Sequence, residues 1–118
     1  MASCHRFELA PGKLAVREAR AELRAVADLP MDALRDAELV VTELVANSVL
    51  HARLAPRDRI EITLCREQRR LTILVDDHGG FTRRRSERGG LGFRVLDTLC
   101  ERWSAQGGRV CAVLALPV

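Results

Sequence analysis

Two polar residues interrupt the longest helical pattern of the sequence. Glu43 and Asn47 lie four positions apart within Asp32–His51, DALRDAELVVTELVANSVLH. Residues at this spacing share one face of a helix and lie about 6 Å from each other. A carboxylate beside an amide oxygen could act as a general base next to a ligand for a hard cation. The pair could equally belong to a solvent-exposed polar stripe.

A second carboxylate follows an alternating apolar stretch. Apolar residues occupy every second position from Leu71 to Val75, which predicts that the Asp77 side chain points to the same buried side. By the same alternation Asp76 faces solvent. A buried carboxylate without a partner is unfavourable, so we expect Asp77 to accept hydrogen bonds from a bound molecule unless an arginine pairs with it. Alternatively, Asp77 only caps the following turn.

A glycine-rich stretch precedes another helical pattern. Gly89, Gly90 and Gly92 lie where backbone N–H groups and the helix dipole can bind an anion. Arg88 and the run Arg83–Arg85 carry donors that suit phosphate oxygens. Glycines before a helix can also be simple hinges, and the arginine run can equally be a solvated face.

Several familiar catalytic patterns are missing from the sequence. There is no G-x-x-x-x-G-K-[ST] motif, and the one lysine, Lys13, is far from the glycines. A P-loop enzyme or a eukaryotic-type protein kinase needs a lysine at the phosphates, so both classes are disfavoured. No G-x-S-x-G motif supports a serine hydrolase, and the three histidines are too scattered for a metal site.

Composition predicts one soluble globular domain spanning residues 1–118, with 47% hydrophobic and 30% charged residues. Aromatic residues make up only 3% and the net charge is +3, which disfavours direct nucleic-acid binding. No apolar run reaches the roughly 20 residues of a membrane span. No C-x-x-C pair occurs among the four cysteines, so we expect four reduced thiols in a cytoplasmic protein.

Hydrophobic periodicity predicts the elements that must position these residues. In the long helix, Asp32 is the expected N-cap, and the expected inward positions are Leu34, Ala37, Val41, Leu44, Val45 and Leu50. The other expected helices are Lys13–Ala27 and Leu91–Arg102, and the expected strands are Arg6–Ala10, Arg59–Cys65, Leu71–Asp77, Trp103–Ala105 and Arg109–Leu116. The apolar last strand is expected to be central. This order predicts an α+β two-layer sandwich, with a mixed, mostly antiparallel sheet covered on one face by about three helices.

Taken in order, these segments resemble a known superfamily. The long helix carries ELVANSVLH, a strand ends in DHGGF, and GGLGF opens a later helix. This set resembles the N, G1 and G2 boxes of the Bergerat-fold (GHKL) ATPases, which include gyrase-type topoisomerases and sensor histidine kinases. Within them the chain is most similar to small bacterial anti-sigma factors that are serine/threonine protein kinases, and the resemblance covers nearly the whole chain.

The resemblance implies ATP and Mg²⁺ as ligands. By position, it makes Asn47 the Mg²⁺ ligand and Glu43 the base that orients or deprotonates the attacking hydroxyl. It makes Asp77 the residue that holds the adenine amino group, with Gly79 allowing the base to approach closely. One amide oxygen cannot satisfy Mg²⁺, so the ion would retain waters and bridge phosphate oxygens.

The same resemblance implies the phosphate side of the site. Gly90 and Gly92, with Leu91 between them, would cradle the phosphates at the start of the last helix. An ATP lid would span Phe81–Gly89 and would include Arg88. The expected cofactor-binding set therefore extends from the long helix to this loop.

The sequence differs from the superfamily pattern in the G1 box. The pattern D-x-G-x-G-F appears here as residues 77–81, DHGGF, which is one residue short. The other alignment uses Asp76 and puts His78 in place of the first glycine. Strand alternation favours the shortened version because it directs Asp77 inward, and a shortened turn could weaken nucleotide affinity.

The resemblance also implies partners. It predicts an anti-sigma regulatory factor that sequesters a sigma factor and phosphorylates a serine or threonine of an antagonist protein. The alternative is a protein-binding module without kinase activity, gated by nucleotide or independent of it. A homodimer is compatible with the resemblance.

Overall fold

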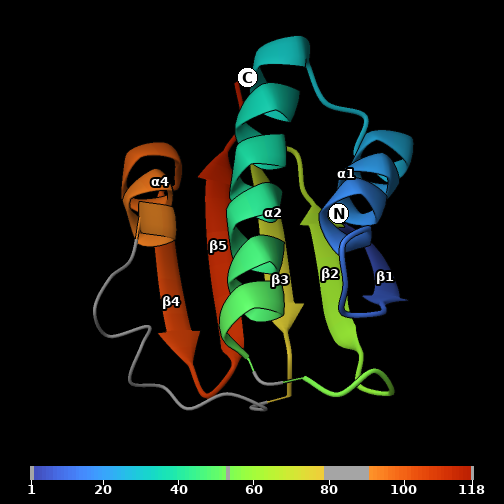
Figure 1. The fold of residues 1–118 in the computed structure, drawn as a ribbon. Helices are drawn as coiled ribbons and strands as arrows, with labels where there is room; N and C mark the ends of the chain where they lie inside the picture. Colours follow the sequence, from blue (N-terminus) through green and yellow to red (C-terminus); the bar gives the residue numbers. More distant parts are fainter. Residues whose placement is uncertain (1, 53, 79–90, 118) are drawn as a thin grey trace.

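The computed structural model describes residues 2–52, 54–78 and 91–117 (Figure 1). Its elements follow the predicted order, and they are β1 (Ser3–Leu9), α1 (Ala15–Val26), α2 (Met31–His51), β2 (Ile60–Arg66), β3 (Arg70–Asp76), α4 (Leu91–Leu99), β4 (Arg102–Gln106) and β5 (Arg109–Ala115). The predicted α+β sandwich is confirmed.

The strands form one five-stranded sheet with the order β1-β2-β3-β5-β4. Every neighbouring pair among the described strands runs antiparallel. Strand β5 lies between β3 and β4, as its apolar sequence predicts. The helices α1, α2 and α4 cover the same face of the sheet, with α2 between the other two (Figure 1). We call this the covered face and the other the open face.

Alternating residues of β2 and β3 form the sheet side of the core. The fully buried residues on the covered face are Ile60, Ile62, Leu71, Ile73 and Val75. They pack against the buried face of α2, to which the predicted residues Ala37, Val41, Leu44 and Val45 belong. The strand register and the helix face therefore agree with the periodicity of the sequence.

The expected inward position of Leu50 is wrong, because its side chain is 73% exposed. Leu50 follows Val41 by nine residues, which is two and a half helical turns and brings it to the opposite side of α2. Leu34 is only partly buried. Ser48 lies on the inward face near this end of the helix instead and is 7% exposed.

Several element ends differ from the predicted ones. Pro30, not Asp32, is the N-cap of α2, and its carbonyl accepts the first helical hydrogen bond from the N–H of Leu34 at 2.8 Å. Proline is well suited to this boundary because its backbone conformation is restricted. The last helix ends at Leu99, since Arg102 already pairs with Val113 in the sheet.

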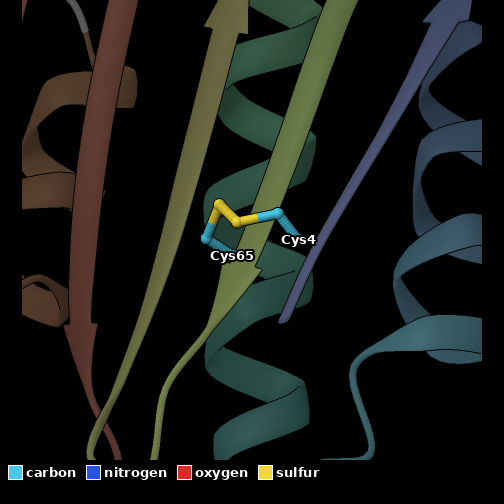
Figure 2. The surroundings of a disulfide bond; sticks show 2 residues. All are labelled: Cys4 and Cys65. Atoms are coloured by element: carbon cyan, nitrogen blue, oxygen red, sulfur yellow. A yellow bond between two sulfur atoms is a disulfide. The ribbon is translucent and has the colours of Figure 1, made fainter. Parts of the chain in front are cut away.

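The expectation of four reduced thiols is wrong for Cys4 and Cys65, which form a disulfide. They are 61 positions apart in sequence but lie directly opposite each other on β1 and β2, with a Cα–Cα distance of 4.0 Å. Figure 2 shows the bridge between the two strands, with α2 behind the sheet. Cys100 and Cys111 are free. Burial, and to a smaller extent Asp97, raises the pKa of the Cys100 thiol to about 11.

Within the described ranges, no helix is both long enough and apolar enough to cross a membrane.

Candidate functional site

The end of β3 meets α2 through a buried polar contact. The Ser48 hydroxyl donates a hydrogen bond to Asp77 Oδ2 at 3.1 Å. Ser48 is 7% exposed and Asp77 is 5% exposed, so the contact lies beneath the helical layer. The predicted inward direction of Asp77 is confirmed. A carboxylate is therefore held at the covered face, directly beside the helix that carries the two other predicted polar residues.

The backbone of Asp77 is fixed from a third element. Its N–H donates to the carbonyl oxygen of Gly108 at 3.0 Å. Gly108 lies in the turn between β4 and β5, where Gly107 and Gly108 have φ angles of +55° and +87°. Glycine adopts this left-handed region without the steric strain that other residues meet. The Gly-Gly turn thus reaches back to the end of β3 and anchors the site.

The neighbouring carboxylate, Asp76, lies on the open face. Its side chain is 16% exposed, and Oδ2 lies 3.6 Å from Nε of Arg109. Asp76 Oδ1 also accepts the backbone N–H of His78 at 2.7 Å. His78 has a φ of +62°, and an aspartate that bonds the backbone two residues later stabilises such a turn. The Asp76 carboxylate thus supports the turn that follows Asp77.

Charged residues surround Asp76 on the open face. Glu61 lies directly opposite it in the β2–β3 register and forms an ion pair with Arg6. The hydrogen bond from Arg6 holds the pKa of the Glu61 carboxyl below its usual value, with smaller contributions from the charges of His78 and Arg109. The open face at this end of the sheet is therefore a network of ion pairs, while among the residues that the structure describes the covered face holds one buried carboxylate, Asp77.

Glu43 and Asn47 lie on α2 beside its buried stripe, and both side chains are partly exposed. Glu43 directly precedes Leu44 of the core, and Asn47 directly precedes Ser48. Among the described residues, neither side chain takes part in a hydrogen bond or ion pair. Two polar groups at the rim of a packed helix face can therefore meet a ligand without losing an internal contact.

The beginning of α4 is held against the edge strand β4. The rings of Phe93 and Trp103 are stacked with centroids 4.8 Å apart, and Trp103 Nε1–H donates to Asp97 Oδ1 at 2.8 Å. These contacts hold α4 to β4 at Phe93 and Asp97, and the backbone of Leu91 and Gly92 begins the helix. The other four predicted cofactor-binding residues, Gly79, Phe81, Arg88 and Gly90, lie outside the described residues, so their roles stay predictions.

Sequence reasoning missed Ser48. Its signal was present, because Ser48 follows Leu44 by four residues and therefore continues the buried stripe of α2. A hydroxyl at a core position needs a hydrogen-bond partner, and the one other buried polar residue among those described is Asp77. The two residues could have been paired on this ground alone.

The described residues contain no group of three or more His, Cys, Asp or Glu side chains that could hold a metal ion.

The chain is similar in fold to a solved bacterial protein. The crystal structure of the RsbU and RsbW domains of Rv1364c from Mycobacterium tuberculosis matches it with a TM-score of 0.67 and 19% identity. The match covers 97% of this chain and 32% of that chain, so this chain spans about a third of the length of its relative. At this identity the likeness is one of fold. No curated protein sequence matches the chain.

The family comparison covers almost the whole chain. The histidine kinase-like ATPase domain matches residues 8–116, which include α2, the end of β3 and α4. The described parts of the three segments that carry the resemblance meet at α2, which packs against α4 and holds Asp77 through Ser48. The chain therefore belongs to the family of histidine kinase-like ATPase domains.

Proposed function

We propose that the protein binds ATP with Mg²⁺ between α2, the end of β3 and the start of α4, and that it acts as an anti-sigma factor with serine/threonine protein kinase activity. The observation that carries the proposal is the hydrogen bond between Ser48 and Asp77. This bond joins a buried carboxylate to the helix that bears Glu43 and Asn47. Membership of the ATPase domain family supports ATP as the bound nucleotide.

The donor and acceptor groups fit the nucleotide. A carboxylate accepts hydrogen bonds at about four lone-pair positions, so Asp77 can accept one from the adenine amino group while it retains the bond from Ser48. The α4 N-terminus, with Leu91 and Gly92, offers backbone N–H groups toward phosphate oxygens. Gly79, Phe81, Arg88 and Gly90 would complete the pocket.

Glu43 and Asn47 would divide the chemistry between them. Asn47 would supply one oxygen to Mg²⁺, whose role in phosphoryl transfer is to neutralise charge on the phosphates. Glu43 would orient the hydroxyl of the substrate protein and take its proton. The hydroxyl oxygen then bonds to the γ-phosphorus, the bond from that phosphorus to the bridging oxygen breaks, and ADP leaves.

The proposed partners are a sigma factor and a small antagonist protein that carries the phosphorylated serine or threonine. Their support is the resemblance of the three sequence boxes together with the fold shared with about a third of the structure that holds the RsbU and RsbW domains. The proposed location is the cytoplasm, where a sigma factor acts, and a homodimer is compatible with the same resemblance. The second candidate function is a protein-binding module that binds nucleotide without phosphoryl transfer, or binds none.

Calorimetric titration with ATP tests the nucleotide site. We expect saturable binding by the intact chain in Mg²⁺ and about tenfold weaker binding by Asn47→Ala, the loss of about one charge-assisted contact. In EDTA the two proteins should bind equally, because the role of Asn47 depends on the metal. Equal affinities in Mg²⁺ would remove Asn47 as a metal ligand, and no binding by the intact chain would contradict the proposal.

Transfer from γ-labelled ATP to purified candidate antagonist proteins separates the two functions. Glu43→Gln keeps the size and hydrogen-bonding capacity of the side chain but removes its basicity. We therefore expect unchanged ATP affinity and at least a hundredfold slower transfer, within the range usual for a general base. Unchanged transfer would exclude Glu43 as the base, and saturable ATP binding without transfer by the intact protein would favour the binding module.

A further inference from the structure

The Cys4–Cys65 disulfide lies at the less buried end of strand β1. Of the seven described residues of this edge strand, only Leu9 at its far end is buried, and Ser3 and Cys4 are exposed. We propose that the two cysteines form a thiol–disulfide switch, which holds the first half of β1 to the sheet when oxidised and releases it when reduced. This switch goes beyond the proposed function and does not depend on nucleotide binding.

The second half of β1 is held without the disulfide. Leu9 belongs to the hydrophobic core, and Phe7 packs against that core. The Arg6 side chain forms an ion pair with Glu61 on β2. Reduction of the disulfide removes none of these contacts, so the strand should stay in place from residue 6 onward.

The first half of β1 is less well packed. His5 Nε2 and Glu22 Oε1 on α1 lie 2.8 Å apart in a hydrogen bond, and the two side chains are 40% and 43% exposed. A cavity of about 220 Å³ lies at this end, lined by residues of the first three strands and the end of α1. Segments with few buried apolar contacts open locally, and chain ends lose order unless they are tied down. We therefore expect this half to lose order once the disulfide opens.

The disulfide can be reached by a small thiolate in the folded protein, because Cys4 is exposed. Attack on the Cys4 sulfur breaks the bond between the two sulfurs and releases Cys65 as a thiolate, which takes a proton from water. A second small thiolate then displaces Cys4 from the mixed disulfide, and the two small molecules leave joined as one disulfide. The protein gains two electrons and two protons, and a small disulfide such as oxidised glutathione reverses each step.

The other two cysteines are not placed to compete in this exchange. Burial raises the pKa of the Cys100 thiol to about 11, so at neutral pH little of it is the thiolate that attacks disulfides. Cys111 on β5 and Cys65 on β2 lie on either side of β3. Two strand spacings, about 10 Å, therefore separate their backbones, which is too far for a disulfide. Reoxidation should therefore restore the original pair.

A reversible disulfide suits the location proposed above. In the cytoplasm, small thiols keep most cysteines reduced, and the disulfides that form there are usually transient and catalytic or redox-sensing. Only the biological use of the switch depends on that location. Its chemistry and its effect on β1 do not.

Backbone amide relaxation measured by NMR on the oxidised and the reduced chain tests the effect on β1. In the oxidised protein we expect order parameters of about 0.85 along the strand, as for rigid backbone. On reduction those of Cys4 and His5 should fall below about 0.6, whereas those of Phe7 and Leu9 should stay unchanged. The double variant Cys4→Ser/Cys65→Ser should resemble the reduced chain with or without reductant. Cys111→Ser is the matched control and should switch like the intact chain.

Alkylation of free thiols, followed by mass spectrometry, tests whether the disulfide opens in the folded protein. Millimolar glutathione should reduce Cys4 and Cys65 without denaturant, and oxidised glutathione should restore the same pair. A disulfide that opens only in urea would overturn the proposal, as would order parameters that reduction leaves unchanged. Loss of the whole fold on reduction, seen by circular dichroism, would also overturn it, because the disulfide would then be a structural cross-link. None of these results bears on nucleotide binding, which is measured separately.

Discussion

The two faces of β3 give neighbouring residues opposite roles. Asp77 lies under the helical layer, where it bonds Ser48 and is 5% exposed. Asp76, one position earlier, lies on the open face beside Arg109 and supports the backbone at His78. The same contrast holds for Ile73, which is fully buried, and Leu74, which is only partly buried.

This comparison teaches that the environment, more than the residue type, assigns the role of a carboxylate. Ion pairs near the surface contribute little to stability, so the pair of Asp76 with Arg109 is expected to add little. A carboxylate below a packed layer is unfavourable unless it is hydrogen-bonded. The hydrogen bond from Ser48 helps to stabilise the buried Asp77 carboxylate. The following predictions test this contrast, from the largest expected effect to the smallest.

Replacing Ile73 and Leu74 separately by alanine tests the packing difference between the two faces. Ile73→Ala should lower the free energy of unfolding by about 4 kcal/mol, because it leaves a cavity beneath α2. Leu74→Ala should cost less than about 1.5 kcal/mol, since it removes a partly exposed group. Urea unfolding monitored by circular dichroism measures both, and equal losses would mean that the open face is covered in solution.

The Cys4–Cys65 disulfide adds a covalent constraint to the open face. Replacing Cys4 and Cys65 together by serine should lower the free energy of unfolding by about 3 kcal/mol, because the unfolded chain loses its cross-link. The same loss should appear when the intact protein is reduced, and the double variant should not respond to reductant. Cys111→Ser, on the same face but without a bridge, is the matched control. If Cys111→Ser lowered the free energy of unfolding as much as the double variant does, the loss could not be assigned to the disulfide.

Asparagine substitutions at Asp77 and Asp76 compare the two carboxylates directly. Asp77→Asn should weaken ATP binding about a hundredfold, or about 2.7 kcal/mol, because an amide cannot match the acceptor strength of a carboxylate toward the adenine amino group. Asp76→Asn should change the affinity less than threefold. Calorimetry in Mg²⁺ gives both values. If Asp76→Asn were the more damaging, the other alignment of the G1 box would be correct.

The Arg6–Glu61 ion pair of the open face should make the melting temperature depend on pH in the acid range. The pKa of Glu61 is lowered in the folded protein, mainly by the hydrogen bond from Arg6. A lowered folded-state pKa adds stability above the ordinary glutamate pKa, and that stability is lost as the pH falls through the folded value. The melting temperature should therefore fall between about pH 5 and pH 3, and Glu61→Gln should reduce the fall slightly.

Glu8→Gln provides the control for this titration. Glu8 is exposed and lies opposite Glu61 on β1. Its substitution should leave the acid-induced fall in melting temperature as it is in the intact chain. An identical pH profile for Glu61→Gln would show that the pair with Arg6 makes no net contribution.

The fold and the direction of Asp77 could be predicted from the sequence because both depend on local period. Alternation in β3 determines which side each residue faces, and the stripe of α2 determines what covers it. The prediction that Leu50 points inward was wrong because it relied on the hydrophobicity of the residue. Leu50 lies on the opposite side of the helix from Val41. The prediction of Asp32 as the N-cap was wrong because the helix begins two residues earlier, with Pro30 as its N-cap.

Contacts between distant segments could not be read in the same way. The pairing of Cys4 with Cys65 depends on the register of β1 against β2, which no local spacing encodes. The bond from Asp77 to Gly108 depends on the length of the β4–β5 hairpin. The Ser48–Asp77 contact was accessible in principle, since both residues were polar at positions that the periodicity assigns to the core.

The disulfide also divides the chain topologically. Residues 4–65 form a covalent ring that contains α1 and α2, and with them Glu43, Asn47 and Ser48. Asp77 and α4 belong to the linear tail that leaves the ring at β2. The candidate site is thus assembled across the boundary between ring and tail, and a protease cut within the ring would leave its two halves covalently joined until a thiol opens the bridge.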